Sequence, residues 1–194
     1  FEYLENIDEL YENFNVTDKW IQSALQILIK NVRKEMSEYK LYNVVPALIT
    51  FLEYLTNWYV RLNRLRLKGE SDDLNWKVSL NVLFDVLMKV NILMSPIVPF
   101  LTESMYQNMR LVIRKDSKLN QESIHHVMIS DVNEKLLNEA ITEKMKDVMS
   151  IIETSRKLRE SKNISLKQAI MSLTIVNKSQ AFFDNLAPFL SYIE

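Results

Sequence analysis

Cationic and aromatic residues are concentrated in one segment of the chain, residues 57–69, with the sequence NWYVRLNRLRLKG. Two aromatic residues are followed by four cationic ones and then by the only glycine in the sequence. Arginine offers a planar set of donors to phosphates and base edges, and an adjacent aromatic ring can stack an unpaired base. Cations in the last turns of a helix also complement its dipole, by about 0.3–1 kcal/mol each. Composition alone favours this second interpretation.

Helical spacing sorts the side chains of this segment onto two faces. The polar stripe contains Asn57, Arg61, Arg64 and Lys68. Trp58 flanks the stripe and is a candidate stacking platform, although its apolar flank favours a core role. Arg66 falls on the apolar side, so we expect it to pair with a carboxylate or to extend along the surface, and it is a weaker candidate contact. Lys19, in the opening turn of the first long helix, is a further candidate.

The composition excludes several kinds of active site. With one glycine, the chain cannot form a Gly-rich phosphate loop. With no cysteine, it has no disulfide, thiol nucleophile or thiolate zinc site. The two histidines, His125 and His126, are neighbours whose side chains point apart. We therefore identify no catalytic residue and expect neither a metal nor a cofactor in this chain.

The charge balance limits any nucleic-acid site to a local patch, because the net charge is −1. A second basic cluster has the same two interpretations as the first, and here we favour helix-end stabilisation; it contains Arg156, Lys157, Arg159 and Lys162. No apolar run reaches the roughly 20 residues that span a bilayer. A reducing, cytoplasmic location with no membrane fits this composition.

The scarcity of turn-forming residues, one glycine and four prolines, predicts a mainly α protein with long helices. Apolar periodicity predicts helices over 18–40, 44–68 and 72–94, one starting at Pro99, and one over 134–160. Thr17 and Asn133 are the expected N-caps of the first and last of these. Gly69 is expected to end the second as its C′ residue. Together these helices predict a helical bundle.

The character of the sequence changes after residue 164. Residues 171–176, MSLTIV, alternate with period two and predict a short strand, which is followed by a predicted helix. A lone strand cannot form a sheet. We therefore expect a helical domain over 1–164 and the start of an incomplete α/β appendage over 165–194. Because the chain begins at Phe1 without a Met, we expect it to be part of a longer polypeptide.

Four segments resemble the anticodon-binding domain of class I aminoacyl-tRNA synthetases, over about residues 17–194. The first runs from TDKWIQSALQ to TNWYVRLNRLRLKGE, whose end most closely resembles isoleucyl enzymes of the eukaryotic cytosolic and archaeal type. The others are LMSPIVPFLTESMYQNM, SIHHVMISDV and SRKLRESKNISLKQAI. Departures from the family pattern occur at Asp131, Ser155, Ser165 and Ala169, where the family has proline or glycine.

The resemblance implies a part that binds a tRNA anticodon stem-loop within a ligase that joins isoleucine to tRNA. ATP and Mg²⁺ would belong to an upstream catalytic domain carrying the HIGH and KMSKS signatures, neither of which occurs here, and an editing domain would also lie upstream. Arg61, Arg64 and Lys68 would contact the stem-loop, with phosphates as the expected ligands. Two alternatives stay open: the same domain of a valyl or methionyl enzyme, and a helical protein-interaction module.

Overall fold

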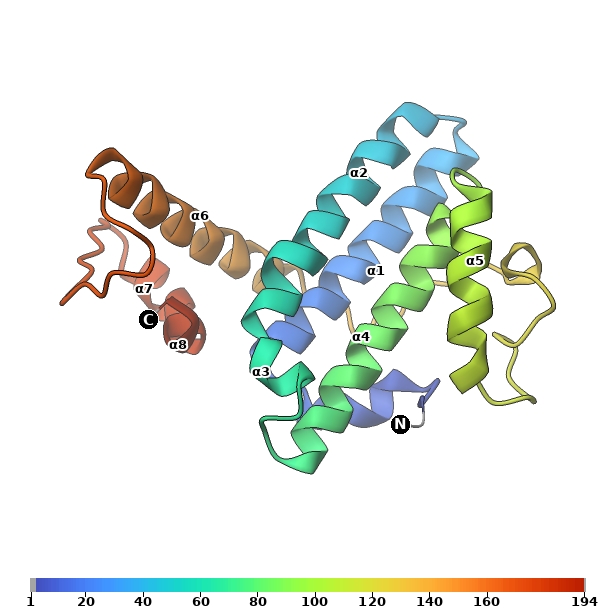
Figure 1. Ribbon diagram of the computed structural model, residues 1–194. Coiled ribbons are helices and arrows are strands. Elements are labelled where there is room, and N and C mark those ends of the chain that lie inside the picture. The colour runs from blue at the N-terminus through green and yellow to red at the C-terminus, as the bar shows by residue number, and fades with distance from the viewer. Residues whose placement is uncertain (1–2, 194) are drawn as a thin grey trace. The chain divides into compact units, whose positions relative to one another are not determined.

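Helices form the regular structure of the chain in the computed structural model, which describes residues 3–193 (Figure 1). Phe1, Glu2 and Glu194 lie outside the described residues. Two compact units are present, Phe1–Asn138 and Glu139–Glu194. The first contains η1 (Ile7–Asn13), α1 (Val16–Ser37), α2 (Leu41–Glu53), η2 (Tyr54–Val60), α3 (Arg64–Leu67), α4 (Asp73–Met94), α5 (Pro99–Met109), η3 (Arg110–Val112) and η4 (Ile124–His126). The second contains α6 (Glu139–Ser161), α7 (Gln180–Leu186), η5 (Ala187–Phe189) and α8 (Leu190–Ile193).

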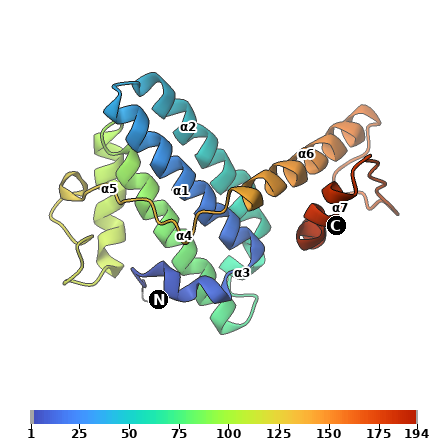
Figure 2. The same cartoon turned by 180° about the vertical axis from the view of Figure 1, so that it is seen from behind.

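The first unit is a helical bundle, as the sequence predicts. α1 packs against α2 and α4, and α4 also packs against α3, α5 and η1. Figures 1 and 2 show α1 and α2 as an antiparallel hairpin, with α4 beside α1 and α5 on the far side of α4. The large side chains that are fully buried in this unit include Trp20, Ile21, Leu25, Ile29, Tyr59, Met88 and Tyr106. No helix among the described residues is long and apolar enough to cross a membrane.

The N-terminus of α1 is capped by Asn15, so the prediction of Thr17 was wrong. Asn15 Oδ1 accepts from the backbone N–H of Asp18 at 2.7 Å, and the Asp18 carboxylate accepts from the N–H of Asn15 at 3.0 Å. This reciprocal capping box satisfies two backbone donors at once. Thr17 lies inside the helix with its hydroxyl fully buried.

The helix predicted over 44–68 is interrupted twice. It is α-helical over α2, becomes a π-helix over η2, and breaks at Asn63, whose φ is −100° and ψ 16°. α3 then ends in a Schellman motif in which the N–H groups of Gly69 and Glu70 donate to the carbonyls of Arg66 and Leu65. Gly69 has a φ of +80°, so its predicted C′ role is confirmed.

Two side chains of α5 hold the loop that follows it. The Glu103 carboxylate accepts three hydrogen bonds at 2.6–2.9 Å. The donors are the side-chain amide of Gln107, the hydroxyl of Ser123 and the backbone N–H of Ile124. The hydroxyl of Tyr106 lies 2.7 Å from the Leu119 carbonyl and accepts from the N–H of Gln121 at 2.7 Å. Because Tyr106 and Ile124 also belong to a buried cluster, the loop is fixed by polar and apolar contacts together.

The last long helix begins at Glu139 and not after Asn133, which was the expected N-cap. Asn133 is occupied elsewhere, since its side-chain amide donates to Asp8 and its backbone N–H donates to Gln26 Oε1 at 2.8 Å. Only a turn follows it, closed by the N–H of Leu136 bonding to the Asn133 carbonyl.

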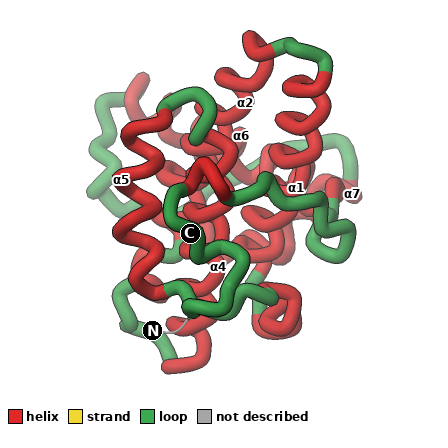
Figure 3. The backbone as a smooth tube through the Cα atoms, turned by 90° about the vertical axis from the view of Figure 1, so that its right-hand side faces the viewer, coloured by secondary structure: helices red, strands yellow, loops and turns green. Residues whose placement is uncertain are grey.

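The predicted strand over 171–176 is not formed. No strand occurs among residues 3–193, and Figure 3 accordingly shows only helices and loops. An isolated extended segment has no ladder partner for its backbone groups, which is the physical reason it stays irregular. α7 follows at Gln180 and packs against α6. The predicted domain boundary between 164 and 165 therefore lies inside the second unit, and as a boundary between domains it stays a prediction.

Two left-handed residues give opposite predictions for stability. Gly69→Ala should lower the free energy of unfolding by about 1 kcal/mol, because the added Cβ meets Trp76 at an ordinary 3.7 Å and only the positive φ is unfavourable. Tyr39→Gly should raise it by about 0.5 kcal/mol, because Tyr39 has a φ of 57° and is 91% exposed. Denaturant titration measures both, and changes of the same sign would contradict this account.

The stability of the chain should depend on pH through the carboxylate of Glu103. Hydrogen bonds from Gln107 and then from Ile124 hold the pKa of Glu103 below its ordinary value of 4.5. A lowered pKa contributes stability that is present above the ordinary value and is lost as pH falls through the folded-state pKa. Glu103→Gln should therefore destabilise the chain near pH 7, and the difference should shrink below pH 4.5. A constant difference in urea titrations from pH 7 to 3 would contradict this role.

Candidate nucleic-acid interface

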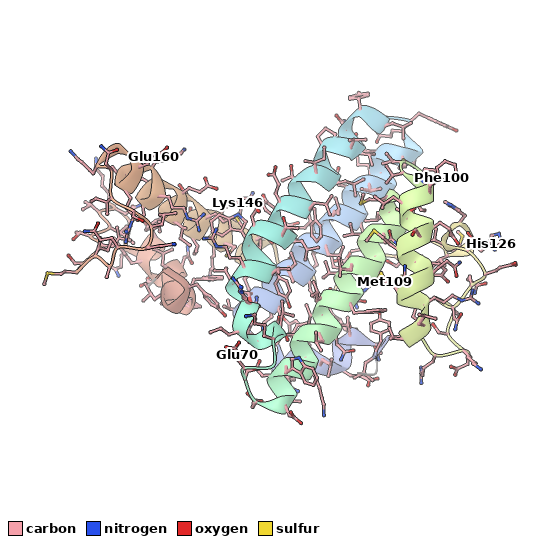
Figure 4. All side chains as sticks on the ribbon, viewed as in Figure 1. Glu70, Phe100, Met109, His126, Lys146 and Glu160 are labelled. Atoms are coloured by element: carbon pink, nitrogen blue, oxygen red, sulfur yellow. The ribbon has the colours of Figure 1, made fainter. Side chains whose placement is uncertain are left out.

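The four residues of the predicted polar stripe are all exposed. They are Asn57, Arg61, Arg64 and Lys68. Neither Arg61 nor Arg64 takes part in an ion pair or side-chain hydrogen bond within the described part of the chain. Lys68 lies 3.9 Å from the carboxylate of Glu70, which Figure 4 labels beyond α3. The two arginines are therefore the cations of this segment that are most open to a polyanion.

Trp58 and Lys19 are engaged by other parts of the chain. Trp58 is 7% exposed, as its interpretation as a core residue requires. Its ring face is therefore not available for stacking a base without a rearrangement of the bundle. Lys19 is half-buried, and its Nζ lies 4.9 Å from the centroid of the Tyr11 ring. A cation over an aromatic face is held there electrostatically, which leaves Lys19 less available than the two arginines.

Arg66 pairs with a buried carboxylate, as its position on the apolar side predicted. Its Nη1 and Nη2 donate to the two oxygens of Asp18 at 3.2 and 2.9 Å. The Asp18 side chain is fully buried and that of Arg66 is 14% exposed. Tyr59 also donates to Asp18, at 2.7 Å. With the backbone N–H of Asn15, four donors bond to the two oxygens of Asp18, and the guanidinium faces the bundle rather than solvent.

Asn63 is a buried polar residue of this network that could not be identified from the sequence pattern we used. Its Oδ1 accepts from Arg66 Nη1 at 2.6 Å, and its Nδ2 donates to Thr17 Oγ1 and to the Tyr59 carbonyl, both at 2.9 Å. Asn63 is 1% exposed. A polar residue four positions after Tyr59 and three before Arg66 shares their inward face, and buried polar groups need partners. That pattern is the signal that could have identified it.

The network also reaches the start of α4. Arg66 Nε donates to Asn75 Oδ1 at 2.8 Å. Asp72 caps α4 by accepting from the N–H of Asn75 at 3.0 Å, and this hydrogen bond holds the pKa of Asp72 below its ordinary range. Figure 1 shows α3 and the first turn of α4 at the same end of the first unit. One guanidinium therefore connects α1, the break at Asn63 and α4.

The other candidates from sequence lie in different surroundings. Arg159 donates to the carbonyls of Ser165 and Gln168 at 3.1 and 2.8 Å, so it holds the segment that follows α6. The helix-end stabilisation that we favoured for its cluster stays a prediction. His125 and His126 are both exposed in η4, and Figure 4 labels His126 on the loop beside α5. Among the described residues, no three His, Asp or Glu side chains are grouped to hold a metal ion.

Comparison with known proteins decides the family. Residues 18–175 match the model of the anticodon-binding domain of tRNA ligase. The chain belongs to this anticodon-binding domain family. Over 180 residues, 93% of the chain, it is 53% identical to an isoleucine–tRNA ligase of Tetrahymena thermophila. It is 37% identical over 193 residues to the cytoplasmic isoleucine–tRNA ligase of Mus musculus and 36% identical over 199 residues to that of Saccharomyces cerevisiae, each covering 98% of the chain.

The anticodon-binding domain accounts for a small part of these relatives, since the chain spans 17%, 15% and 18% of their respective lengths. These three relatives are isoleucine enzymes, which supports that branch of the family over the valyl and methionyl alternatives. The matched range, 18–175, crosses both the structural division after Asn138 and the predicted boundary after residue 164.

The geometry divides the family segment TNWYVRLNRLRLKGE into two sets of residues. Tyr59, Asn63 and Arg66 face inward and make the network, while Gly69 ends α3. Arg61 and Arg64 lie on either side of the break and face solvent. One set of residues thus holds the segment in the bundle, and the other set, the two arginines, is exposed on it.

The buried pair predicts a large loss of stability on removing its anion. Asp18→Asn should lower the free energy of unfolding by about 3 kcal/mol, because it leaves the half-buried guanidinium of Arg66 without its charge partner. Asp131→Asn is the matched control, since Asp131 pairs with Arg33 at 2.9 Å but is 92% exposed. Asp131→Asn should lower the free energy of unfolding by less than about 0.5 kcal/mol. If urea titrations gave the same loss of unfolding free energy for both variants, the pair of Asp18 and Arg66 would not behave as a buried ion pair.

Proposed function

We propose that this chain binds the anticodon stem-loop of the tRNA for isoleucine and positions it for aminoacylation. The observation that carries the proposal is the exposure of Arg61 and Arg64, without side-chain partners in the described part, on a segment whose residues Asn63 and Arg66 are hydrogen-bonded to the bundle. Family membership and the names of the relatives support the choice of RNA. Loop bases of RNA can be splayed and read at their edges, while phosphate contacts fix the register.

The two arginines are proposed to contact phosphates, and Lys68 and Asn57 are secondary contacts. A guanidinium donates two parallel hydrogen bonds to a phosphate, which an ammonium cannot do. Lys68 is the weaker candidate because Glu70 competes for its charge at 3.9 Å. Arg66, Trp58 and Lys19 are left out of the contact surface, because each is engaged by the bundle.

We further propose that the chain acts within an isoleucine–tRNA ligase in the cytoplasm, as the names of its relatives suggest. The reaction joins isoleucine to tRNA and converts ATP to AMP and pyrophosphate. Mg²⁺ does not fit the donors of this chain, because no three His, Asp or Glu side chains are grouped to hold a metal ion among the described residues. A Gly-rich loop that could hold the phosphates of ATP is excluded by the single glycine of the sequence. We therefore assign them, with editing, to other domains of the same polypeptide.

A helical protein-interaction module is the second candidate function. The observation that favours it is the apolar surface of α5 and η3, where Phe100, Leu101, Leu111 and Val112 are exposed. Figure 4 labels Phe100 at the start of α5, and its side chain is 91% exposed. This surface and the arginines belong to different helices, so the two functions have separable tests.

Binding of a 5′-labelled anticodon stem-loop of isoleucine tRNA should be salt-dependent and should need both arginines. Arg61→Ala and Arg64→Ala should each weaken binding about three- to tenfold and reduce the slope of log K against log salt by about 0.7–0.9 per lost phosphate contact. Fluorescence anisotropy at two salt concentrations, with a valine-tRNA stem-loop as competitor, measures affinity, slope and specificity.

The matched control is Lys115→Ala, which removes one exposed cation from the loop after α5. It should leave affinity within twofold of the parent. Binding that survives both arginine substitutions would contradict the proposal. Binding that is lost equally in all three variants would indicate a general electrostatic effect rather than a defined site.

A further inference from the structure

The guanidinium of Arg66 is shared among three parts of the bundle. It makes four hydrogen bonds of 2.6–3.2 Å, to Asp18 in α1, Asn63 at the break and Asn75 in α4. These residues are separated from Arg66 by 48, 3 and 9 positions in sequence. The planar fork reaches all of them simultaneously because its donors point in fixed directions. A lysine would offer a single nitrogen in their place.

Stability alone does not explain a pair of this kind. Buried ion pairs are often no more stabilising than apolar residues of similar size, and their best-attested role is to fix one arrangement of the chain. The same unit contains a contrasting case, Asp85 and Lys89, which pair at 2.8 Å within one helix four residues apart. Asp85 also accepts hydrogen bonds from Tyr3 and from Gln22 of α1, both at 2.9 Å, but the cation of this pair, Lys89, bonds only within its own helix among the described residues. Lys89 therefore orients no element against another, whereas Arg66 bonds to Asp18 of a different helix.

The arrangement that is fixed is the direction of the two exposed arginines. Arg61 precedes the break at Asn63 and Arg64 follows it. Across a break, the relative direction of two side chains is set by the local backbone and not by the regular helical repeat. Asn63 is held on one side by Thr17 and on the other by Arg66. The spacing of Arg61 and Arg64 therefore depends on a side chain that itself faces the interior.

We infer that Arg66, through Asp18 and Asn63, is a positioning residue that sets Arg61 and Arg64 to meet two phosphates of one RNA strand. This inference rests on the proposed function. Two cations held at a fixed spacing bind two phosphates with less loss of conformational freedom than two independent side chains. The pair Asp18–Arg66 thereby contributes to RNA affinity without touching RNA.

A double-mutant cycle on stem-loop binding tests the inference. Arg66→Lys keeps the charge but removes the fork, and it should weaken binding by roughly tenfold in the parent chain. In a chain that already carries Arg61→Ala and Arg64→Ala, the same change should weaken binding by less than about twofold, since nothing remains to be positioned. Binding is measured well below the unfolding temperature of every variant, so that all are folded.

The matched control is Lys89→Gln, which disrupts the other buried pair, whose cation is 20% exposed against 14% for Arg66. It should lower thermal stability and leave RNA affinity within twofold. An equal loss from Arg66→Lys in both backgrounds, or no loss in either, would overturn positioning while leaving the proposed function intact. Binding that ignores the loss of Arg61 and Arg64 would overturn the proposed function and the RNA role of Arg66 with it.

Discussion

The arrangement of the candidate interface depends on one buried carboxylate, that of Asp18. A fully buried anion must be paired, and its partner is Arg66, 48 residues later in the chain. The hydrogen bonds that satisfy this charge link α3 to the first turn of α1. The remaining donors of the guanidinium then fix Asn63 and the start of α4. The outward direction of Arg61 and Arg64 follows from this inward constraint.

The chain has a single glycine, and hydrogen bonds from polar side chains stabilise several of its irregular backbone segments. Asn15 closes the capping box of α1, Asn63 supports the break in the second long helix, and Tyr106 anchors the loop after α5. Each is buried or half-buried and makes two or more hydrogen bonds. Such groups are unfavourable if left unsatisfied, so they specify one backbone path.

The helices and the exposed stripe could be predicted from sequence, because both follow from the spacing of apolar and charged side chains along a regular helix. The exposure of Arg61 and Arg64 and the pairing of Arg66 are examples. What could not be predicted depends on contacts between distant residues. The break at Asn63 depends on Thr17, and the late start of α6 depends on Asp8 and Gln26 holding Asn133. Local periodicity contains no information about such partners.

The most direct test of the account is a side-chain NMR titration of the chain, labelled with ¹⁵N-arginine, with the isoleucine anticodon stem-loop. The Nε–H signals of Arg61 and Arg64 should shift on binding, because both are exposed and have no side-chain partner in the described part. The Nε–H signal of Arg66 should stay in place, because it donates to Asn75 at 2.8 Å. Unchanged signals of Arg61 and Arg64 with a shifted signal of Arg66 would contradict the account.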